Sequence, residues 1–211
     1  MLQYTNMKVL SEVASIRTGY TFREKIEDAA LSKANAHIAQ IKDVRLIAET
    51  TSSMSLNISQ LPTIEWQGKD KAIVPPGSVL LPSRGSRGGY FKASYLIDNN
   101  KGTLPLIVTS QFLVITANDC VLPEFLCWSL NQPQIQFWLS EGAGSQGSGM
   151  VMLKTNVGND IKINIPSIEV QKKIININQL WEKEQELNTR LQANREMMLK
   201  GMYQKLLNEN N

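Results

Sequence analysis

The sequence predicts an α+β protein, in which a mixed α/β domain is followed by a long C-terminal α-helix that forms a coiled coil with a second copy. Two observations favour this fold class. Up to Pro166, short β-type runs bounded by Gly, Pro and Asn turns alternate with helical patterns. Residues 168–207 contain no proline and a single glycine, and they are rich in Glu, Gln, Lys, Leu and Met, which lose little rotamer freedom in a helix. We therefore divide the chain into a domain over residues 1–166 and a long helix over residues 167–211.

Helices are expected where apolar residues recur on one face. Residues 9–16 form a short helix of this kind, which Gly19 ends. Pro123 opens a second helix that runs to Leu130, because proline is favoured in the first turn. Helical structure resumes over residues 133–139.

Strands are expected where short β-branched and apolar runs lie between turns. They cover residues 36–41, 61–66, 78–81, 90–97, 106–115 and 160–165. Loops are expected where Ser, Thr, Asn, Gly and Arg dominate, over residues 49–60, 82–89 and 142–149.

The predicted C-terminal helix carries one apolar stripe, which we call the seam. Its residues recur at intervals of seven and four: Leu180, Leu187, Leu191, Met198, Met202 and Leu206, with Trp181 beside them. An 11-residue repeat is close to the period of a straight helix, so little supercoil is expected. A helix of roughly 38 residues would be roughly 57 Å long, more than a small domain can cover. The seam therefore predicts a homodimer, although a helix folded onto its own domain remains an alternative.

The composition limits the class of protein. The chain has 211 residues, a net charge of +3 and 42% hydrophobic residues, which are ordinary values for a globular protein. Any DNA affinity must come from local clusters of cations rather than from bulk charge. The first 20 residues contain no apolar run, so neither a signal peptide nor contact with a membrane is expected. Two cysteines are compatible with a reducing cytoplasm, and a cytoplasmic location is expected.

Three stretches are candidates for contact with nucleic acid. Residues 82–92 combine Arg84, Arg87 and Lys92 with two aromatic residues, although a solvated hairpin turn is an equally good interpretation. Arg17 and Arg23 flank Tyr20 and Phe22 in a similar way. Arginine can hold guanine with two hydrogen bonds, and glycines allow the backbone to come close to DNA.

The third stretch is the Gly- and Ser-rich segment 142–149, with Ser145 and Gln146. Glutamine can pair with adenine. The segment matches GxGxxG, but a helix precedes it instead of a strand, so a dinucleotide site is not expected. The alternative is a loop without a ligand.

No catalytic constellation is present in the sequence. His37 is the single histidine and lies in a predicted strand, and Cys127 is expected in the core. One histidine and two cysteines do not make a zinc site of standard spacing. We therefore expect no metal, no cofactor and no enzymatic activity.

Six stretches form a further pattern in chain order: residues 10–22, 38–44, 76–86, 108–115, 122–126 and 165–174. Together they resemble the specificity (S) subunit of type I restriction–modification systems, over about residues 8–207. The last stretch, IPSIEVQKKI, is the most specific, since it is similar to the IPPLxxQxxI sequence that precedes the family's conserved spacer helix. Ser78 stands where the family usually has Asp.

The resemblance implies a function. Residues 1–166 would be a target-recognition domain that binds one short DNA half-site, and residues 167–211 a spacer helix that docks the methyltransferase (M) subunit. In this interpretation Ser86 and Lys154 join the DNA-contacting residues, and the subunit does no chemistry itself. Whether a restriction (R) subunit also binds stays open.

Family members typically carry two recognition domains, so this chain resembles a half-subunit. Two antiparallel copies would then bind a palindromic, interrupted target. The alternatives are a fragment of a two-domain subunit, or a coiled-coil scaffold without sequence-specific DNA binding.

Overall fold

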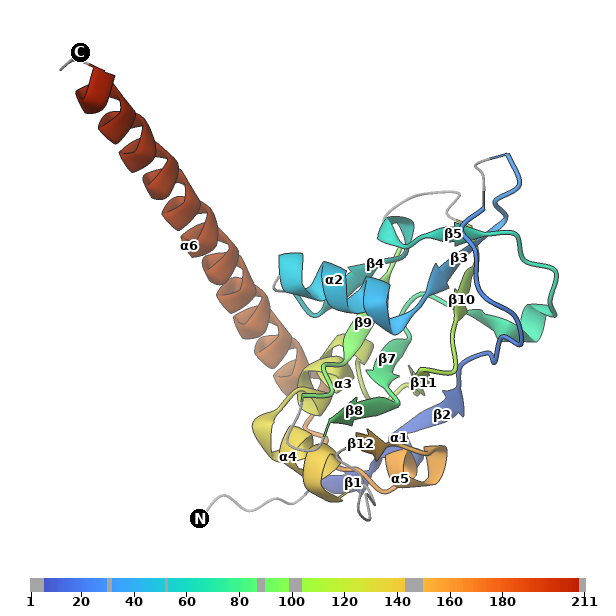
Figure 1. Cartoon of the computed structure of the whole chain (residues 1–211). Helices are drawn as coiled ribbons and strands as arrows, with labels where there is room; N and C mark the ends of the chain where they lie inside the picture. Colours follow the sequence, from blue (N-terminus) through green and yellow to red (C-terminus); the bar gives the residue numbers. More distant parts are fainter. Residues whose placement is uncertain are drawn as a thin grey trace. The chain divides into compact units, whose positions relative to one another are not determined.

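The computed structural model describes residues 6–29, 32–51, 53–86, 90–98, 104–142 and 150–208. The chain divides into two compact units, one up to Ile175 and one from Asn176. In the described part of the chain, the first unit holds all the β-strands and the shorter helices (Figure 1), and the second is a single helical segment.

The strands of the first unit are short. They are β1 (Met7–Val9), β2 (Ala14–Thr18), β3 (Ala36–Ala39), β4 (Ser55–Asn57), β5 (Thr63–Ile64), β6 (Ile73–Val74), β7 (Val79–Pro82), β8 (Arg84–Ser86), β9 (Ser94–Ile97), β10 (Leu106–Val108), β11 (Phe112–Ala117), β12 (Met150–Met152) and β13 (Lys162–Asn164). The helices are α1 (Leu10–Val13), α2 (Ile41–Thr51), α3 (Pro123–Leu130), α4 (Pro133–Gly142), α5 (Thr155–Asn159) and α6 (Ile168–Asn208), with 3-10 turns η1 (Ile58–Gln60) and η2 (Asp70–Ala72).

Two sheets form the framework of this unit. The larger has the strand order β2-β11-β7-β9-β4, and the smaller has the order β5-β3-β10-β6. Strands β3 and β10 are parallel, as are β4 and β9, whereas the other pairs in these sheets are antiparallel. The described residues also form two-stranded ladders, β1 with β13 and β8 with β12. The predicted mixed α/β class is therefore confirmed.

Successive side chains of the larger sheet point to opposite faces, and each face is buried. On one face, Leu81 of β7 and Leu113 of β11 pack with Phe125 of α3. On the other, Leu80 and Phe112 pack against residues of the smaller sheet and against α2. Helix α2, light blue in Figure 1, also lies beside β4. The core thus continues from the helices α3 and α4 through both sheets.

Two predictions of secondary structure in the first 60 residues are wrong. Residues 9–16 are not one helix, because α1 ends at Val13 and β2 begins at Ala14, where it pairs with Ala117 of β11. Residues 49–60 are not an exposed loop, since they hold the end of α2, strand β4 and η1. Leu56 and Ile58 are buried in the core between the sheets.

The expected strand 106–115 is two strands in two different sheets. β10 belongs to the smaller sheet and β11 to the larger, and the chain crosses between them at Thr109. The Thr109 N–H and hydroxyl both donate to the carbonyl oxygen of Ala39 at 3.1 Å, which holds this crossing in place. The expected loop 82–89 also contains strand β8.

The long C-terminal helix is confirmed. α6 has 41 residues, so it is about 61 Å long. Its first turns belong to the first unit, where Gln171 is completely buried. The Gln171 amide accepts a bond from Leu122 N–H (2.8 Å) and donates to the carbonyl oxygens of Cys120 (3.1 Å) and Pro166 (2.9 Å). The buried amide of Gln171 and the three backbone groups that it contacts are therefore all hydrogen-bonded.

Candidate nucleic-acid interface

The β8–β12 ladder brings two sequence-distant segments together. Ser86 pairs with Met150, and Arg84 pairs with Met152. The segment that follows Ser86 and the segment that precedes Met150 are therefore connected to two residues that lie side by side in the ladder. Two of the three stretches predicted to contact DNA are joined to the domain at this one end of the ladder.

Strand β8 lies directly on the side chain of Phe91. A Cβ atom added to Gly85 would be 2.6 Å from the Phe91 ring, so only glycine fits there without a shift. Phe91 itself is fully buried. Of the two aromatic residues in the 82–92 stretch, Phe91 therefore packs in the core and is not placed to contact a ligand.

Side-chain amides hold the segment that carries Tyr90 and Lys92. Gln136 accepts a hydrogen bond from Phe91 N–H (2.7 Å) and donates to the Phe91 carbonyl oxygen (3.0 Å). Asn131 makes the same pair of bonds with the backbone of Ala93, at 2.8 and 3.0 Å. These amides act as a strand partner, and the alternation of the backbone turns Tyr90 and Lys92 away from the core.

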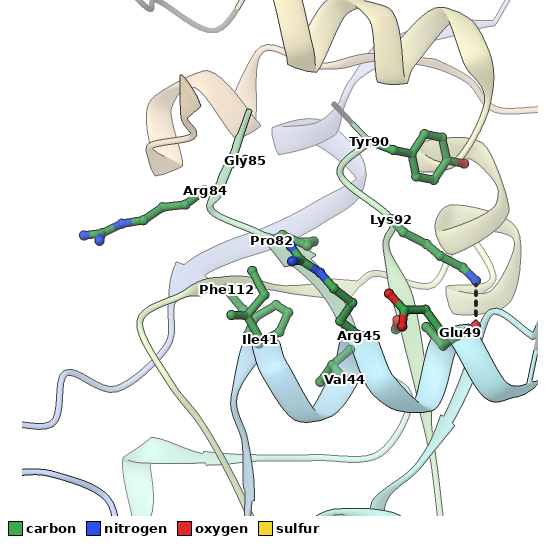
Figure 2. Close-up of a pocket in the computed structure, with 12 residues that line it drawn as sticks. Ile41, Val44, Arg45, Glu49, Pro82, Arg84, Gly85, Tyr90, Lys92 and Phe112 are labelled. Atoms are coloured by element: carbon green, nitrogen blue, oxygen red, sulfur yellow. Dashed lines mark hydrogen bonds between the residues drawn. The ribbon is translucent and has the colours of Figure 1, made fainter. Parts of the chain in front are cut away.

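A pocket of about 400 Å³ lies between α2, β8 and this segment (Figure 2). Its apolar wall includes Val44 and Phe112, both buried. Three cations line it, Arg45, Arg84 and Lys92, against one carboxylate, Glu49. The pocket is therefore electropositive.

The polar side chains differ in how they are held. Lys92 Nζ donates to the carbonyl oxygen of Ala48 at 3.4 Å, whereas Arg84 is exposed and points away from Lys92 and Tyr90 in Figure 2. The Tyr90 hydroxyl donates to the Asn131 carbonyl oxygen at 2.8 Å. Burial of that hydroxyl raises the pKa of Tyr90 above its ordinary value. Tyr90 therefore stays neutral and leaves the positive charge of the pocket intact.

The other predicted contact residues lie elsewhere. Arg17 is on β2, half-buried, and its guanidinium donates to the Ile73 carbonyl oxygen at 3.0 Å. Arg23 is exposed, and Lys154 is an exposed residue at the N-cap of α5. Ser86 ends β8, but its side chain is outside the described part of the structure, as are Arg87, Ser145 and Gln146.

Arg45 was not predicted. It lies on α2, a helix that was not predicted from the sequence. A strand was expected over residues 36–41 and a loop over residues 49–60, so no expected helix placed Arg45 beside Lys92. In Figure 2 its side chain rises from α2 toward Pro82. A prediction of helix α2 would have identified Arg45 as a candidate site residue.

Two further residues have structural positions. His37 is buried in β3, and its Nδ1 lies 2.8 Å from the Leu61 carbonyl oxygen. Cys127 is fully buried in the core. Among the described residues there is no cluster of His, Cys, Asp and Glu that could hold a metal ion, and no helix is long and apolar enough to cross a membrane.

The seam of α6 is exposed throughout the second unit. Its side chains have exposed fractions of 46–72%. Charged side chains interact with one another on a different face of the helix: Glu186 accepts from Lys183 at 2.8 Å and lies 3.6 Å from Arg190. The hydrogen bond from Lys183 lowers the pKa of Glu186.

Comparisons with known proteins agree with this architecture. Residues 5–194 match the family described as "Type I restriction modification DNA specificity domain". The specificity subunit of the type I restriction enzyme HindI from Haemophilus influenzae is 26% identical over 149 residues, which are 70% of this chain and 30% of that protein.

Two solved structures share the fold. One comes from a study of complex assembly and conformational transition of the type I R-M system (TM-score 0.57, 15% identity, 93% of this chain and 43% of that chain). The other is the HsdS subunit from Thermoanaerobacter tengcongensis (TM-score 0.53, 14% identity, 85% of this chain and 37% of that chain).

Since the family match extends over most of the sequence, the chain belongs to the family of type I restriction–modification specificity subunits, whose role is DNA target recognition. At the level of the family, these are recognition subunits rather than catalytic ones. The chain spans less than half the length of each relative above.

Proposed function

We propose that the first unit binds duplex DNA in a sequence-specific way through the pocket between α2 and β8 and through the segments attached to the β8–β12 ladder. Arg84, Arg87 and Lys92 are the principal contacts. The remaining proposed contacts are Arg17, Arg23, Ser86, Ser145, Gln146 and Lys154.

The observation that carries this proposal is the grouping of Arg45, Arg84 and Lys92 around one pocket. These residues come from different elements, so a local run of charge does not explain the cluster. Cations bind phosphates, and arginine also recognises guanine edges. Membership of the specificity family supports the same function.

The target duplex is first identified by mapping methylated adenines in cells that co-express the methyltransferase. The variants Arg84→Ala and Arg87→Ala then test the proposed DNA contacts. Loss of a phosphate contact should weaken binding to every duplex about eightfold at 0.1 M salt and reduce the salt slope by about 0.9. Loss of a base contact should instead reduce discrimination by about 1–3 kcal/mol at one position.

Lys8→Ala is the matched control, because Lys8 is an exposed cation on the short strand β1 and does not line the pocket. If both arginine variants behave as this control does, the interface is assigned to the wrong surface. If the unsubstituted chain shows no preference for any duplex, even with its methyltransferase, the protein is a coiled-coil scaffold instead.

The second part of the proposal is that two copies pair through the seam of α6. Its side chains are among the large apolar residues that are most exposed to solvent. Burying one leucine side chain completely is worth about 1.5–3 kcal/mol, so several seam residues together can hold a dimer.

Leu187→Glu combined with Leu191→Glu should give monomers in multi-angle light scattering, because four carboxylates would face one another in the dimer. Gln185→Glu combined with Thr189→Glu adds the same charge on another face of α6 and should leave the dimer intact. An unchanged mass for the seam variant would reject the pairing.

Antiparallel pairing would put the two recognition domains at opposite ends of the paired helices, because each domain precedes its helix in the chain. The target would then be bipartite and palindromic, with half-site centres at least about 34 Å apart, one turn of DNA. We propose that the paired helices also dock the methyltransferase subunit, with a restriction subunit as a further partner still to be tested.

A further inference from the structure

A second electropositive pocket lies on the first unit, away from the one described above. It has a volume of about 650 Å³, and its cations are Arg17, Lys69 and Lys71. No carboxylate lines it, although Asp70 lies between the two lysines in sequence. It shares no lining residue with the pocket between α2 and β8. In the described part of the chain, no ion pair joins these three cations to an acidic residue.

Arg17 is held in a fixed position at the wall of this pocket. It lies on β2 opposite Val114, and its guanidinium spans to the smaller sheet by donating to the Ile73 carbonyl oxygen of β6. This bond uses one of the five N–H donors of a guanidinium. The side chain is therefore oriented in advance, with further donors to offer to an anion.

Aromatic rings support the other wall. Tyr20 makes T-shaped contacts with Phe22 and Trp66, with ring centroids 5.1 and 4.8 Å apart and interplanar angles of 81° and 88°. Gly68 lies so close to the Trp66 ring that it has no room for a Cβ atom. This close approach sets the path of the backbone just before Lys69.

The two pockets are lined from the same face of the larger sheet. Arg17 pairs with Val114 and Pro82 pairs with Phe112, and Val114 and Phe112 point to one face because they are two residues apart. Arg17 and Pro82 are separated by two strand spacings and two residues, so their Cα atoms are about 12 Å apart. This separation is shorter than one turn of duplex DNA, which is about 34 Å long.

We infer that the Arg17–Lys69–Lys71 pocket binds a phosphate group of the duplex backbone and so fixes the position of the domain on DNA without contributing to sequence choice. This inference rests on the proposed DNA binding, which it deepens by separating a positioning contact from the contacts that choose the bases. Phosphate contacts of this kind set register and orientation but carry no sequence information directly.

The test is the double variant Lys69→Gln/Lys71→Gln, which leaves Arg17 and its bond to Ile73 in place. Affinity of the full-length chain is measured for the target duplex and for an unrelated duplex of equal length over a range of KCl concentrations. Loss of one phosphate contact should lower both affinities by the same factor, about eightfold at 0.1 M KCl, and reduce the salt slope by about 0.9.

Lys25→Gln/Lys33→Gln is the matched control. It removes two exposed lysines from a different hollow of the same unit, which is lined by Glu24, Glu27, Asp28 and Glu65. The control should leave both affinities and the salt slope within error of the unsubstituted chain.

Three results would overturn the inference. If the two double variants have equal DNA affinities and equal salt slopes, the pocket does not contact DNA. The proposed function would still hold in that case, provided that the unsubstituted chain binds its target duplex. A loss confined to the target duplex would make the pocket a base-contacting site. Calorimetric binding of inorganic phosphate that the Lys69/Lys71 variant abolishes, with DNA affinity unchanged, would assign the pocket to a free anion.

Discussion

The start of α6 offers the sharpest test of how the first unit is held together. Gln171 is completely buried, and its amide satisfies the Leu122 N–H and the carbonyl oxygens of Cys120 and Pro166. Gln171→Leu keeps much of the volume of the side chain and removes all three hydrogen bonds. The variant therefore isolates the polar contribution of one residue.

The expected loss of stability follows from the number of these bonds. A hydrogen bond within a protein contributes about 1 kcal/mol net, and a buried group left without a partner costs about 1–3 kcal/mol. Three bonds therefore predict a loss of about 3 kcal/mol. For a chain of this length, each kcal/mol lowers Tm by about 2–4 °C, so Tm should fall by about 6–12 °C.

Urea unfolding followed by near-ultraviolet circular dichroism measures this loss. Gln192→Leu is the control, because Gln192 is an exposed residue of the same helix whose amide donates to Glu196 at 3.3 Å. The control should change the free energy of unfolding by less than about 0.5 kcal/mol. If Gln171→Leu costs no more than Gln192→Leu, the three bonds do not hold the start of α6, and the reasoning fails.

Two further predictions concern the packing of the first unit. Gly85→Ala should cost about 1–3 kcal/mol, because the new methyl group would be 2.6 Å from the Phe91 ring. Gly201→Ala, in the last turns of α6 where a Cβ atom meets nothing, should instead stabilise the protein by about 0.5–1 kcal/mol. Thermal unfolding compares the two variants, and equal effects would contradict the close contact at Gly85. Burial, followed by the charge of Glu124, raises the pKa of Tyr95 from 10.0 to about 12. The stability that Tyr95 contributes is therefore complete below pH 10 and declines as the pH approaches 12. Tyr95→Phe should remove part of the decline in the urea midpoint between pH 9 and 11.5, and an identical decline in both proteins would argue against the raised pKa.

The elements that were predicted correctly are those with a strong local signal. Pro123 at the start of α3 and the proline-free stretch of α6 are examples. Residues 49–60 were predicted wrongly because Ser, Thr and Asn outnumber the apolar anchors, of which Leu56 and Ile58 are buried by distant strands. The continuous apolar run at 106–115 gave no sign that the chain crosses between sheets at Thr109.

For the candidate site, local composition identified Arg84 and Lys92 but not the pocket that they share. The pocket depends on α2, which supplies Arg45, and on the pairing of β8 with β12 across more than sixty residues of sequence. The cations Lys69 and Lys71 also stand apart from Arg17 in the sequence, and they meet it only because β2 and β6 belong to neighbouring sheets. Such groupings are created by topology, which short patterns do not report.

Side-chain amides that bond the backbone of a distant segment recur in the first unit. Asn131 and Gln136 bond the backbone of the Phe91–Ala93 segment, and Gln171 bonds the backbone before α3. A side-chain amide offers one acceptor and two donors, so it can replace a missing strand partner, whereas a carboxylate offers acceptors only. Replacing Asn131 or Gln136 with Asp or Glu would therefore set an anion against a carbonyl oxygen and release the segment that carries Lys92. Asn131 at the end of α3 and Gln136 of α4 therefore fix the position of the segment that carries Tyr90 and Lys92.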